Sequence, residues 1–129
     1  MINLVIDTNV LVSALWSENG TPYKIMQMIP NGRFKICFCE DIMIEYKTVL
    51  SRPNFGFKTS QVDNLLLKIV KFGKNINVNK SSIVMPDEDD RKFYDVAKES
   101  GAILITGNLK HFPKEKFIMS PKDFLLKYI

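Results

Sequence analysis

The chain has 129 residues and a formal net charge of +4, with 46% hydrophobic and 25% charged residues. This length and composition predict one globular domain over residues 1–129 and exclude a collagen-like or intrinsically disordered chain. No apolar run approaches the roughly 20 residues of a membrane span, so we expect no membrane contact. Cys37 and Cys39 lie too close together for a normal disulfide framework, so we expect a cytoplasmic protein in a reducing compartment.

Short apolar runs alternate with segments of helical periodicity along the chain. We expect strands at residues 3–6, 34–38, 76–78, 102–105 and 116–119. We expect helices at residues 10–16, from 21 to the turn at 30–32, and at 40–50, 60–72, 89–100 and 121–128. This alternation predicts an α/β domain with a central, mainly parallel sheet of about four or five strands covered by helices. The pattern does not define the order of the strands.

Asp7 directly follows the first apolar run, residues 3–6. In open α/β sheets, ligands bind at the carboxyl ends of the strands, so a carboxylate here is a candidate functional group. The alternative is that Asp7 caps the helix that begins near Thr8, which is a common structural use of aspartate.

Glu45 lies on or beside the buried stripe of the expected helix at 40–50, because it follows Ile42 by three residues and precedes Tyr46. An unpaired carboxylate is costly in such a place. Glu45 is therefore either a functional acid or an acid at the edge of the stripe that pairs with a lysine.

Asp90 shares a helical face with Phe93 and Tyr94, on the side that we expect to be buried. It also lies in the first turn of its expected helix, where an acid is stabilised by the helix dipole. The neighbouring Asp87 and Asp89 are not placed on this face by their spacing, and the pattern leaves open whether either of them joins a site.

The three acids Asp7, Glu45 and Asp90 belong to separate elements that can converge at one end of a parallel sheet. Converging carboxylates raise one another's pKa unless a cation lies between them. Oxygen ligands without histidine or cysteine favour Mg²⁺ or Mn²⁺. Such an ion activates water and stabilises the negative charge of the pentacovalent phosphorane, so the pattern predicts a metal-dependent nuclease.

Five short motifs follow one another along the chain. They are Val5-Ile6-Asp7-Thr8-Asn9-Val10-Leu11, Glu45-Tyr46 with Val49-Leu50-Ser51-Arg52-Pro53, Asp87-Glu88-Asp89-Asp90 with Lys92-Phe93 and Ala97, Ile105-Thr106-Gly107-Asn108 with His111-Phe112, and Ser120-Pro121-Lys122-Asp123-Phe124-Leu125. In this order they resemble, nearly end to end, the PIN-domain family, and in particular its small single-domain bacterial branch of VapC-like toxins from toxin–antitoxin pairs.

The resemblance implies a three-layer α/β/α PIN-like domain that cleaves single-stranded RNA with Mg²⁺ or Mn²⁺. It implies that Asp7, Glu45 and Asp90 are the catalytic, metal-binding acids. It also implies that Asn9 helps to shape the pocket and that Thr106 lies near the waters of the metal. Members of this branch are commonly homodimers that a cognate antitoxin protein restrains.

Asn108 departs from the family's usual pattern, since many relatives have aspartate at this position. Asparagine still offers a carbonyl oxygen, but the change removes one negative charge. We therefore expect one metal ion and leave a second open, with Asp87 or Asp89 as a compensating acid. Asn108 can alternatively cap a helix after the strand expected at 102–105.

The positive charge of the chain is concentrated in residues 52–80, which contain 6 basic residues and 1 acidic residue. A candidate substrate surface here consists of Arg52, Lys68, Lys71 and Lys74, and binding of an RNA backbone to such a surface weakens steeply with salt. The alternative is a solvated helix face without a partner.

Two other classes of function stay open. A phosphatase with an aspartyl nucleophile also begins with a strand followed by aspartate, but it usually has a second acid two residues later, where this chain has Asn9. A catalytically weak or inactive module that binds RNA or protein would use the acids only structurally, and the missing acid at Asn108 is compatible with that. His111 is the only histidine and has no evident serine or cysteine partner, so triad catalysis is not expected.

Overall fold

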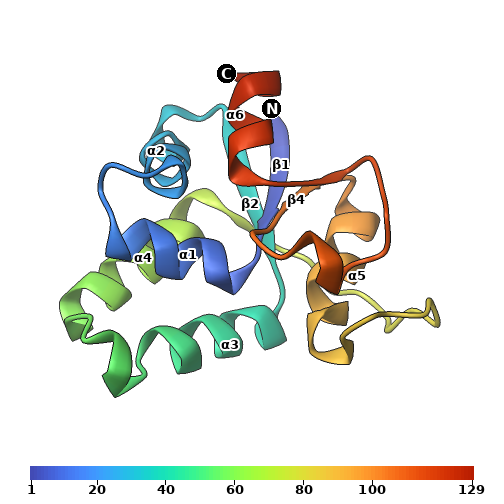
Figure 1. Ribbon diagram of the computed structural model, residues 1–129, viewed down its shortest axis with the longest axis horizontal. Coiled ribbons are helices and arrows are strands. Elements are labelled where there is room, and N and C mark those ends of the chain that lie inside the picture. The colour runs from blue at the N-terminus through green and yellow to red at the C-terminus, as the bar shows by residue number, and fades with distance from the viewer.

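The computed structural model describes residues 1–129 as a five-stranded, all-parallel sheet with helices packed around it (Figure 1). The strands are β1 (Ile2–Ile6), β2 (Phe34–Phe38), β3 (Lys74–Asn75), β4 (Ile103–Ile105) and β5 (Ile118–Met119). The helices are α1 (Thr8–Trp16), α2 (Thr21–Gln27), α3 (Glu40–Leu50), α4 (Thr59–Phe72), α5 (Arg91–Ser100) and α6 (Pro121–Tyr128). The α/β class and the parallel sheet that the sequence predicts are confirmed.

Strand β1 lies at the centre of the sheet, in the order β3-β2-β1-β4-β5. One edge of β1 pairs Ile2 with Phe34 of β2, and the other edge pairs Ile6 with Ile105 of β4. The second half of β1 is completely buried, as expected for a parallel strand that is covered on both faces. Because all strands are parallel, the residues that follow β1, β2 and β4 emerge at the same edge of the sheet.

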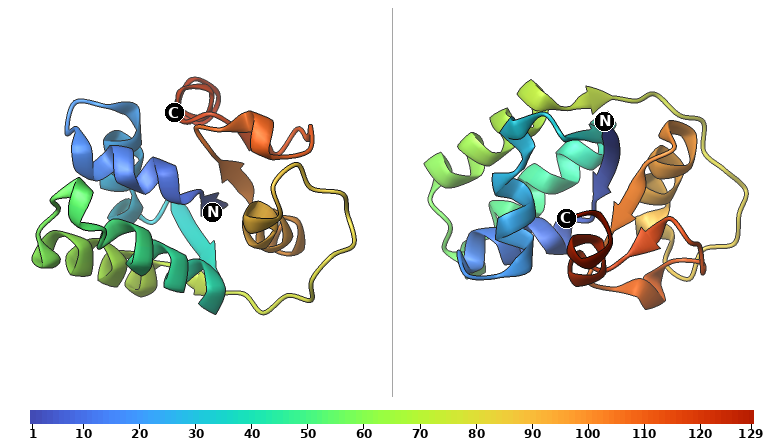
Figure 2. Two further views of the ribbon diagram at one scale, coloured as in Figure 1. Left: turned by 60° about the horizontal axis from the view of Figure 1, so that its bottom comes forward. Right: turned by 90° about the horizontal axis from the view of Figure 1, so that it is seen from above.

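Helix α5 covers one face of the sheet, where it packs against β1, β2 and β4. Helix α2 packs against both α1 and α6 on the opposite side, and α3 and α4 form a pair next to β2 (Figure 2). The aromatic rings of Phe34 in β2 and Phe124 in α6 lie 5.3 Å apart between their centroids, which joins α6 to the sheet. These layers leave the carboxyl edge of the sheet between α1, α3 and the start of α5.

The strand expected at residues 76–78 is wrong. The edge strand is instead β3, which pairs Lys74 and Asn75 with Cys37 and Phe38 of β2. Edge pairing depends on where the chain meets β2, and the apolar pattern of residues 76–78 carries no information on that point. The boundaries of β2, α3 and α6 agree with the expected ranges, and the other boundaries differ by one or two residues.

Gly73 allows α4 to end directly against β2. A Cβ atom at this position would overlap the backbone carbonyl oxygens of Ile69 and Ile36 and would press on the ring of Phe38. Only glycine permits two backbone segments to approach so closely without a shift of one of them. The chain therefore passes from α4 into β3 without a connecting loop.

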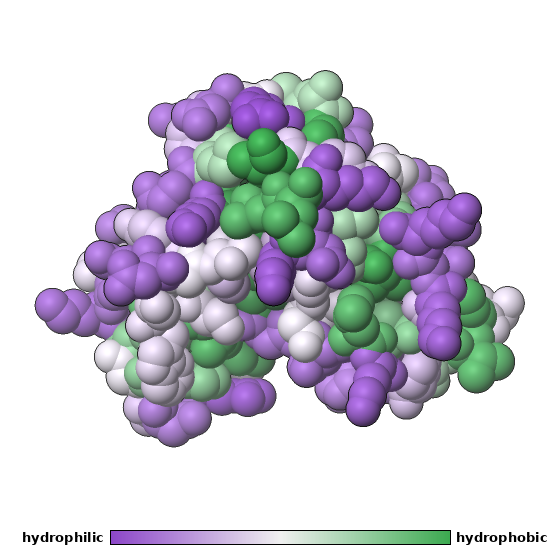
Figure 3. Space-filling model, turned by 45° about the horizontal axis from the view of Figure 1, so that its top comes forward, coloured by the Kyte–Doolittle hydropathy of each residue, from purple (hydrophilic) through white to green (hydrophobic).

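No helix in the structure has both the length and the apolar character needed to cross a membrane. On the face drawn in Figure 3, hydrophobic residues form small, separate patches among hydrophilic ones. Cys37 and Cys39 are both free thiols.

Replacement Gly73→Ala should destabilise the fold, because either α4 or β2 must move to make room for the methyl group. We expect the free energy of unfolding to fall by about 2 to 3 kcal/mol in urea denaturation. Gly20→Ala is the matched control, since its Cβ atom would lie 3.6 Å from the nearest atoms, and its cost should stay below about 1 kcal/mol. Equal losses in the two variants would contradict the close approach at Gly73.

Candidate active site

Asp7 lies where β1 ends at the carboxyl edge of the sheet, and only 5% of the residue is exposed. Its carboxylate oxygen Oδ2 accepts a hydrogen bond of 2.7 Å from the Thr106 hydroxyl, which lies at the end of β4. The Asn9 side-chain amide donates a longer bond of 3.4 Å to the same oxygen. The backbone of Asp7 occupies the N-cap position of α1, but its side chain makes no capping hydrogen bond. The capping alternative therefore does not explain this carboxylate.

Glu45 faces the same edge from α3. Its Oε2 atom accepts a hydrogen bond from the Thr8 hydroxyl, and the neighbouring Tyr46 hydroxyl donates to the carbonyl of Ile6. The other oxygen, Oε1, lies 2.7 Å from the Lys92 ammonium, and the glutamate side chain is 25% exposed. Glu45 is thus paired with a lysine, as one interpretation of the sequence expected, and it also lies beside the end of β1.

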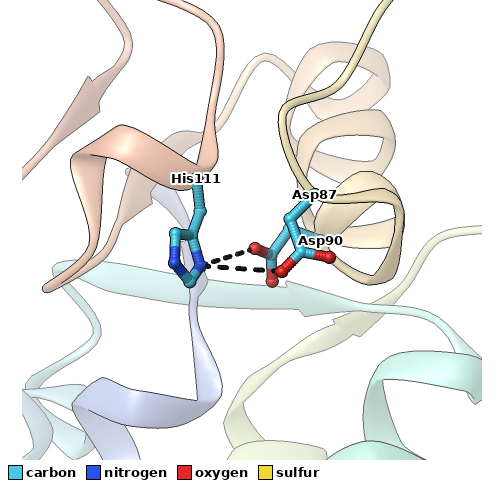
Figure 4. Close-up of side chains that lie close together, drawn as sticks. All are labelled: Asp87, Asp90 and His111. Atoms are coloured by element: carbon cyan, nitrogen blue, oxygen red, sulfur yellow. Dashed lines mark hydrogen bonds and ion pairs between the residues drawn. The ribbon is translucent and has the colours of Figure 1, made fainter.

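Asp90, Asp87 and His111 form a compact cluster at the same edge (Figure 4). The His111 Nδ1 atom lies 3.1 Å from Oδ2 of Asp90 and 3.9 Å from Oδ2 of Asp87. One potential ligand atom from each of the three residues lies within 4.8 Å of the other two. Asp89 is exposed, and only its backbone forms hydrogen bonds, from its N–H to Asp87 and from the Lys92 ammonium to its carbonyl oxygen, so Asp87 is the neighbour whose carboxylate joins Asp90.

The electrostatics of Asp7 show that the acids share one site. Burial raises the pKa of Asp7, and the negative charge of Glu45 raises it further. The hydrogen bond from Thr106 opposes this rise because it stabilises the charged form. Asp7 and Glu45 therefore repel each other across the end of β1.

The pKa of Asp90 is also raised by burial and by neighbouring negative charges. Burial, followed by the negative charges of Asp7 and Asp87, raises the pKa of Asp90 to about 6, while His111 opposes the rise. Asp7, Glu45, Asp87 and Asp90 are called the acidic group below. Their charges act on one another at this edge of the sheet. The group whose potential ligand atoms lie within 4.8 Å of one another is nevertheless Asp87, Asp90 and His111, and it includes neither Asp7 nor Glu45.

Two buried charged residues of α5, Arg91 and Asp95, hold the segment that leads to Asp87. The Arg91 guanidinium donates to the carbonyl oxygens of Ser81 and Ile83 at 2.9 and 2.7 Å, and it pairs with Glu88. Asp95, one turn further along α5, accepts a bond of 3.1 Å from the Ser81 amide. Both Arg91 and Asp95 are less than 10% exposed, so the segment that leads to Asp87 is fixed although it has no secondary structure.

The three supporting residues expected from the sequence lie around Asp7. Asn9 accepts a hydrogen bond of 3.2 Å from the backbone N–H of Gly107, which connects α1 to the end of β4. The backbone N–H of Asn108 donates to the Thr106 hydroxyl at 2.9 Å. Asn108 occupies the cap position of the 3-10 helix at 109–111, but its exposed side chain makes no capping bond.

The candidate substrate surface of Arg52, Lys68, Lys71 and Lys74 makes no hydrogen bond or ion pair with the acidic group. The basic side chain that contacts the group is Lys92, which the sequence reasoning did not select. Lys92 also lines a polar cleft between the starts of α3 and α5, together with Glu40, Asp41, Asn77, Lys80 and Asp89.

The sequence places His111 in the fourth motif and argues against a catalytic triad, but it does not predict that His111 lies beside the acids. It lies 21 residues after Asp90 and outside any periodic helix, so no face argument connects the two. The available signal was that the single histidine follows shortly after Thr106, at the end of the strand that lies next to β1.

Comparison with known proteins identifies a family and a relative. The family model described as PIN domain matches residues 3–110, a range that includes the whole acidic group and ends one residue before His111. The uncharacterized protein MJ1680 of Methanocaldococcus jannaschii is 36% identical over 119 aligned residues, which cover 83% of this chain and 71% of that protein.

Replacement Asp90→Asn should stabilise the metal-free protein at neutral pH. The folded protein holds the Asp90 proton up to about pH 6, whereas the unfolded chain releases it near pH 3.8, so stability is lost as the pH rises between these values. We expect a gain of about 1 to 2 kcal/mol in the free energy of unfolding at pH 7 in EDTA, measured in urea, and no gain at pH 3.5. The exposed neighbour Asp89→Asn is the control. A loss of stability at pH 7 in Asp90→Asn would contradict the repulsion.

Proposed function

The chain belongs to the PIN-domain family, and from this membership and the acidic group we propose that it is a metal-dependent endoribonuclease that hydrolyses single-stranded RNA. PIN domains are in general nucleases, so a nuclease-type function follows from the family itself. The dependence on Mg²⁺ or Mn²⁺ and the single-stranded RNA substrate are the proposal.

The observation that carries the proposal is the convergence of buried carboxylates at the end of β1. Asp7 is 5% exposed and the side chain of Asp90 is 13% exposed, and the negative charge of Asp7 raises the free energy of the charged form of Asp90. A protein that only needed a stable fold gains nothing from this repulsion. A divalent cation between the carboxylates removes it.

The donor set fits a hard divalent cation. Asp7, Glu45 and Asp90 offer carboxylate oxygens, which Mg²⁺ and Mn²⁺ prefer, and no cysteine lies among them. We propose that these three residues hold one ion. The position where a fourth acid would support a second ion is Asn108, whose side chain is exposed and uncharged.

When bound, the cation supplies positive charge against the phosphodiester and activates a water for attack on phosphorus. The residues of this chain orient the acids for that task. Thr106 fixes one oxygen of Asp7 by a hydrogen bond of 2.7 Å, and the Thr8 hydroxyl fixes one oxygen of Glu45. Lys92 adds a positive charge 2.7 Å from Glu45, where it can contact a phosphate of the RNA.

For the biological role, we propose the toxin of a toxin–antitoxin pair, a homodimer in the cytoplasm that an antitoxin protein restrains. The support is the resemblance of five motifs to the VapC-like branch. Expression of the protein should then arrest growth, and co-expression of a small protein encoded beside it should relieve the arrest. Growth arrest that persists in Asp7→Asn would contradict toxicity through cleavage.

A non-catalytic module that binds RNA or protein is the second candidate, and the ion pairs of the site favour it. Glu45 pairs with Lys92, and Asp90 contacts His111, so both acids have partners without a metal ion. An aspartyl phosphatase has less support, since Asn9 donates a hydrogen bond to Asp7 and supplies no second acid.

Cleavage of a fluorescently labelled single-stranded RNA separates these candidates. We expect cleavage with Mg²⁺ or Mn²⁺, none in excess EDTA, and a loss of at least about 100-fold in rate for Asp7→Asn, because the variant lacks a charged ligand at the end of β1. Asp63→Asn, which removes an exposed acid paired with Lys47 on another part of the surface, is the control and should cleave normally. Cleavage in EDTA, or full activity of Asp7→Asn with an intact fold, would refute a metal-dependent mechanism.

A further inference from the structure

The cluster of Asp87, Asp90 and His111 contains a nitrogen donor that the proposed function does not use. We propose that His111 is a ligand of the divalent ion, in the role that a fourth carboxylate would have at Asn108, and that this nitrogen makes the site prefer Mn²⁺ to Mg²⁺. The inference rests on the proposed function, since it assumes that the acidic group holds an ion.

The first argument is geometric. Two ligands on one ion with bonds of about 2.1 Å lie at most about 4.2 Å apart. The His111 Nδ1 atom lies 3.1 Å from Oδ2 of Asp90 and 3.9 Å from Oδ2 of Asp87, so both distances fall within that limit. Figure 4 shows the imidazole edge turned toward the two carboxylates, so no rearrangement of the backbone is needed.

The second argument is the place of His111 in the fold. The element that follows β4 usually brings an acid to the site in this family, and here Asn108 brings an exposed amide without a hydrogen bond to the acids. The 3-10 helix at 109–111 instead directs the side chain of its last residue, His111, to Asp90. The segment after β4 therefore still brings a potential metal ligand to the site, but the ligand atom is the imidazole nitrogen of His111 where the family usually has a carboxylate oxygen.

The third argument concerns accessibility. The side chains of His111 and Asp87 are 47% and 45% exposed, so an ion can reach them from solvent, whereas Asp90 is 13% exposed and closes the inner side. The Nε2 atom of His111 makes no hydrogen bond, which leaves the ring free to adjust around an ion.

A nitrogen ligand changes the choice of ion. Mg²⁺ binds oxygen ligands almost exclusively. Mn²⁺ also suits oxygen ligands, but as a first-row transition-metal ion it accepts an imidazole nitrogen beside them more readily than Mg²⁺ does. The competing explanation is that His111 only neutralises the two carboxylates in the metal-free protein. The two explanations predict opposite effects of His111 removal on metal affinity. Loss of a ligand weakens binding of the ion, whereas loss of a positive charge that the ion must displace strengthens it.

The decisive measurement is Mn²⁺ and Mg²⁺ affinity by calorimetric titration at pH 7.5 for the wild type, His111→Ala and His111→Asp. We expect His111→Ala to lose at least about tenfold in Mn²⁺ affinity and much less in Mg²⁺ affinity. We expect His111→Asp to recover binding of both ions without the preference for Mn²⁺. Lys110→Ala is the matched control, since it removes a positive charge from the same turn without changing the cluster.

Mn²⁺ affinity in His111→Ala that equals or exceeds that of the wild type would overturn the proposal and favour the neutralising role. A wild type that binds neither ion would overturn this proposal and the proposed function together, so the two failures are distinguishable.

A spectroscopic test avoids substitutions. His111 is the only histidine in the chain, so a coordinated imidazole nitrogen in the electron spin echo spectrum of the Mn²⁺-loaded protein can come from no other side chain of that type. We expect this nitrogen coupling in the wild type. Its absence at saturating Mn²⁺ would overturn the proposal even if His111→Ala did not fold.

Discussion

Electrostatic repulsion between carboxylates at the carboxyl edge of the sheet is the constraint around which this part of the molecule is arranged. Parallel strands end at one edge, so Asp7 after β1 and the acids of α3 and the α5 entry necessarily approach each other. Asp7 cannot turn away, because β1 is buried up to Ile6 and the carboxylate is hydrogen-bonded to Thr106. The surrounding side chains offset the repulsion one acid at a time, with Lys92 at Glu45 and His111 at Asp90. Asp7 is the exception, since its hydrogen-bond partners are the neutral side chains of Thr106 and Asn9, so no cationic side chain contacts it directly.

Much of the fold follows from local sequence, and the parts that do not follow depend on contacts between distant segments. The range of α3 was predictable because its apolar spacing is regular and Pro53 follows shortly after its end. The edge strand was not predictable, because β3 has two exposed residues without any apolar pattern and exists only through its pairing with Cys37 and Phe38. Strand order is likewise a property of how the helices pack, and no segment encodes it alone.

Some residues of the candidate site could likewise be predicted from local sequence, whereas others depend on contacts between distant segments. Glu45 and Asp90 could be selected because each lies on a helical face that should be apolar, and Asp7 because it ends a strand. Asp87 could not be distinguished from Asp89 by spacing. Its position depends on Arg91 and Asp95, which bind backbone atoms of the segment before it and are themselves buried, charged residues that an apolar pattern ignores.

His111 and Asn108 show why a missing acid at one position does not by itself define the chemistry of a site. Two hydrogen bonds fix the start of the chain after β4. The backbone N–H of Asn108 donates to the Thr106 hydroxyl, and the backbone N–H of Gly107 donates to the Asn9 side chain. Both use backbone N–H donors, so they persist whatever side chain position 108 has, and the 3-10 helix that follows is aimed at the acids in either case. An asparagine at 108 therefore changes the charge of the site without changing its shape, and the same backbone path brings a different side chain into the place nearest Asp90.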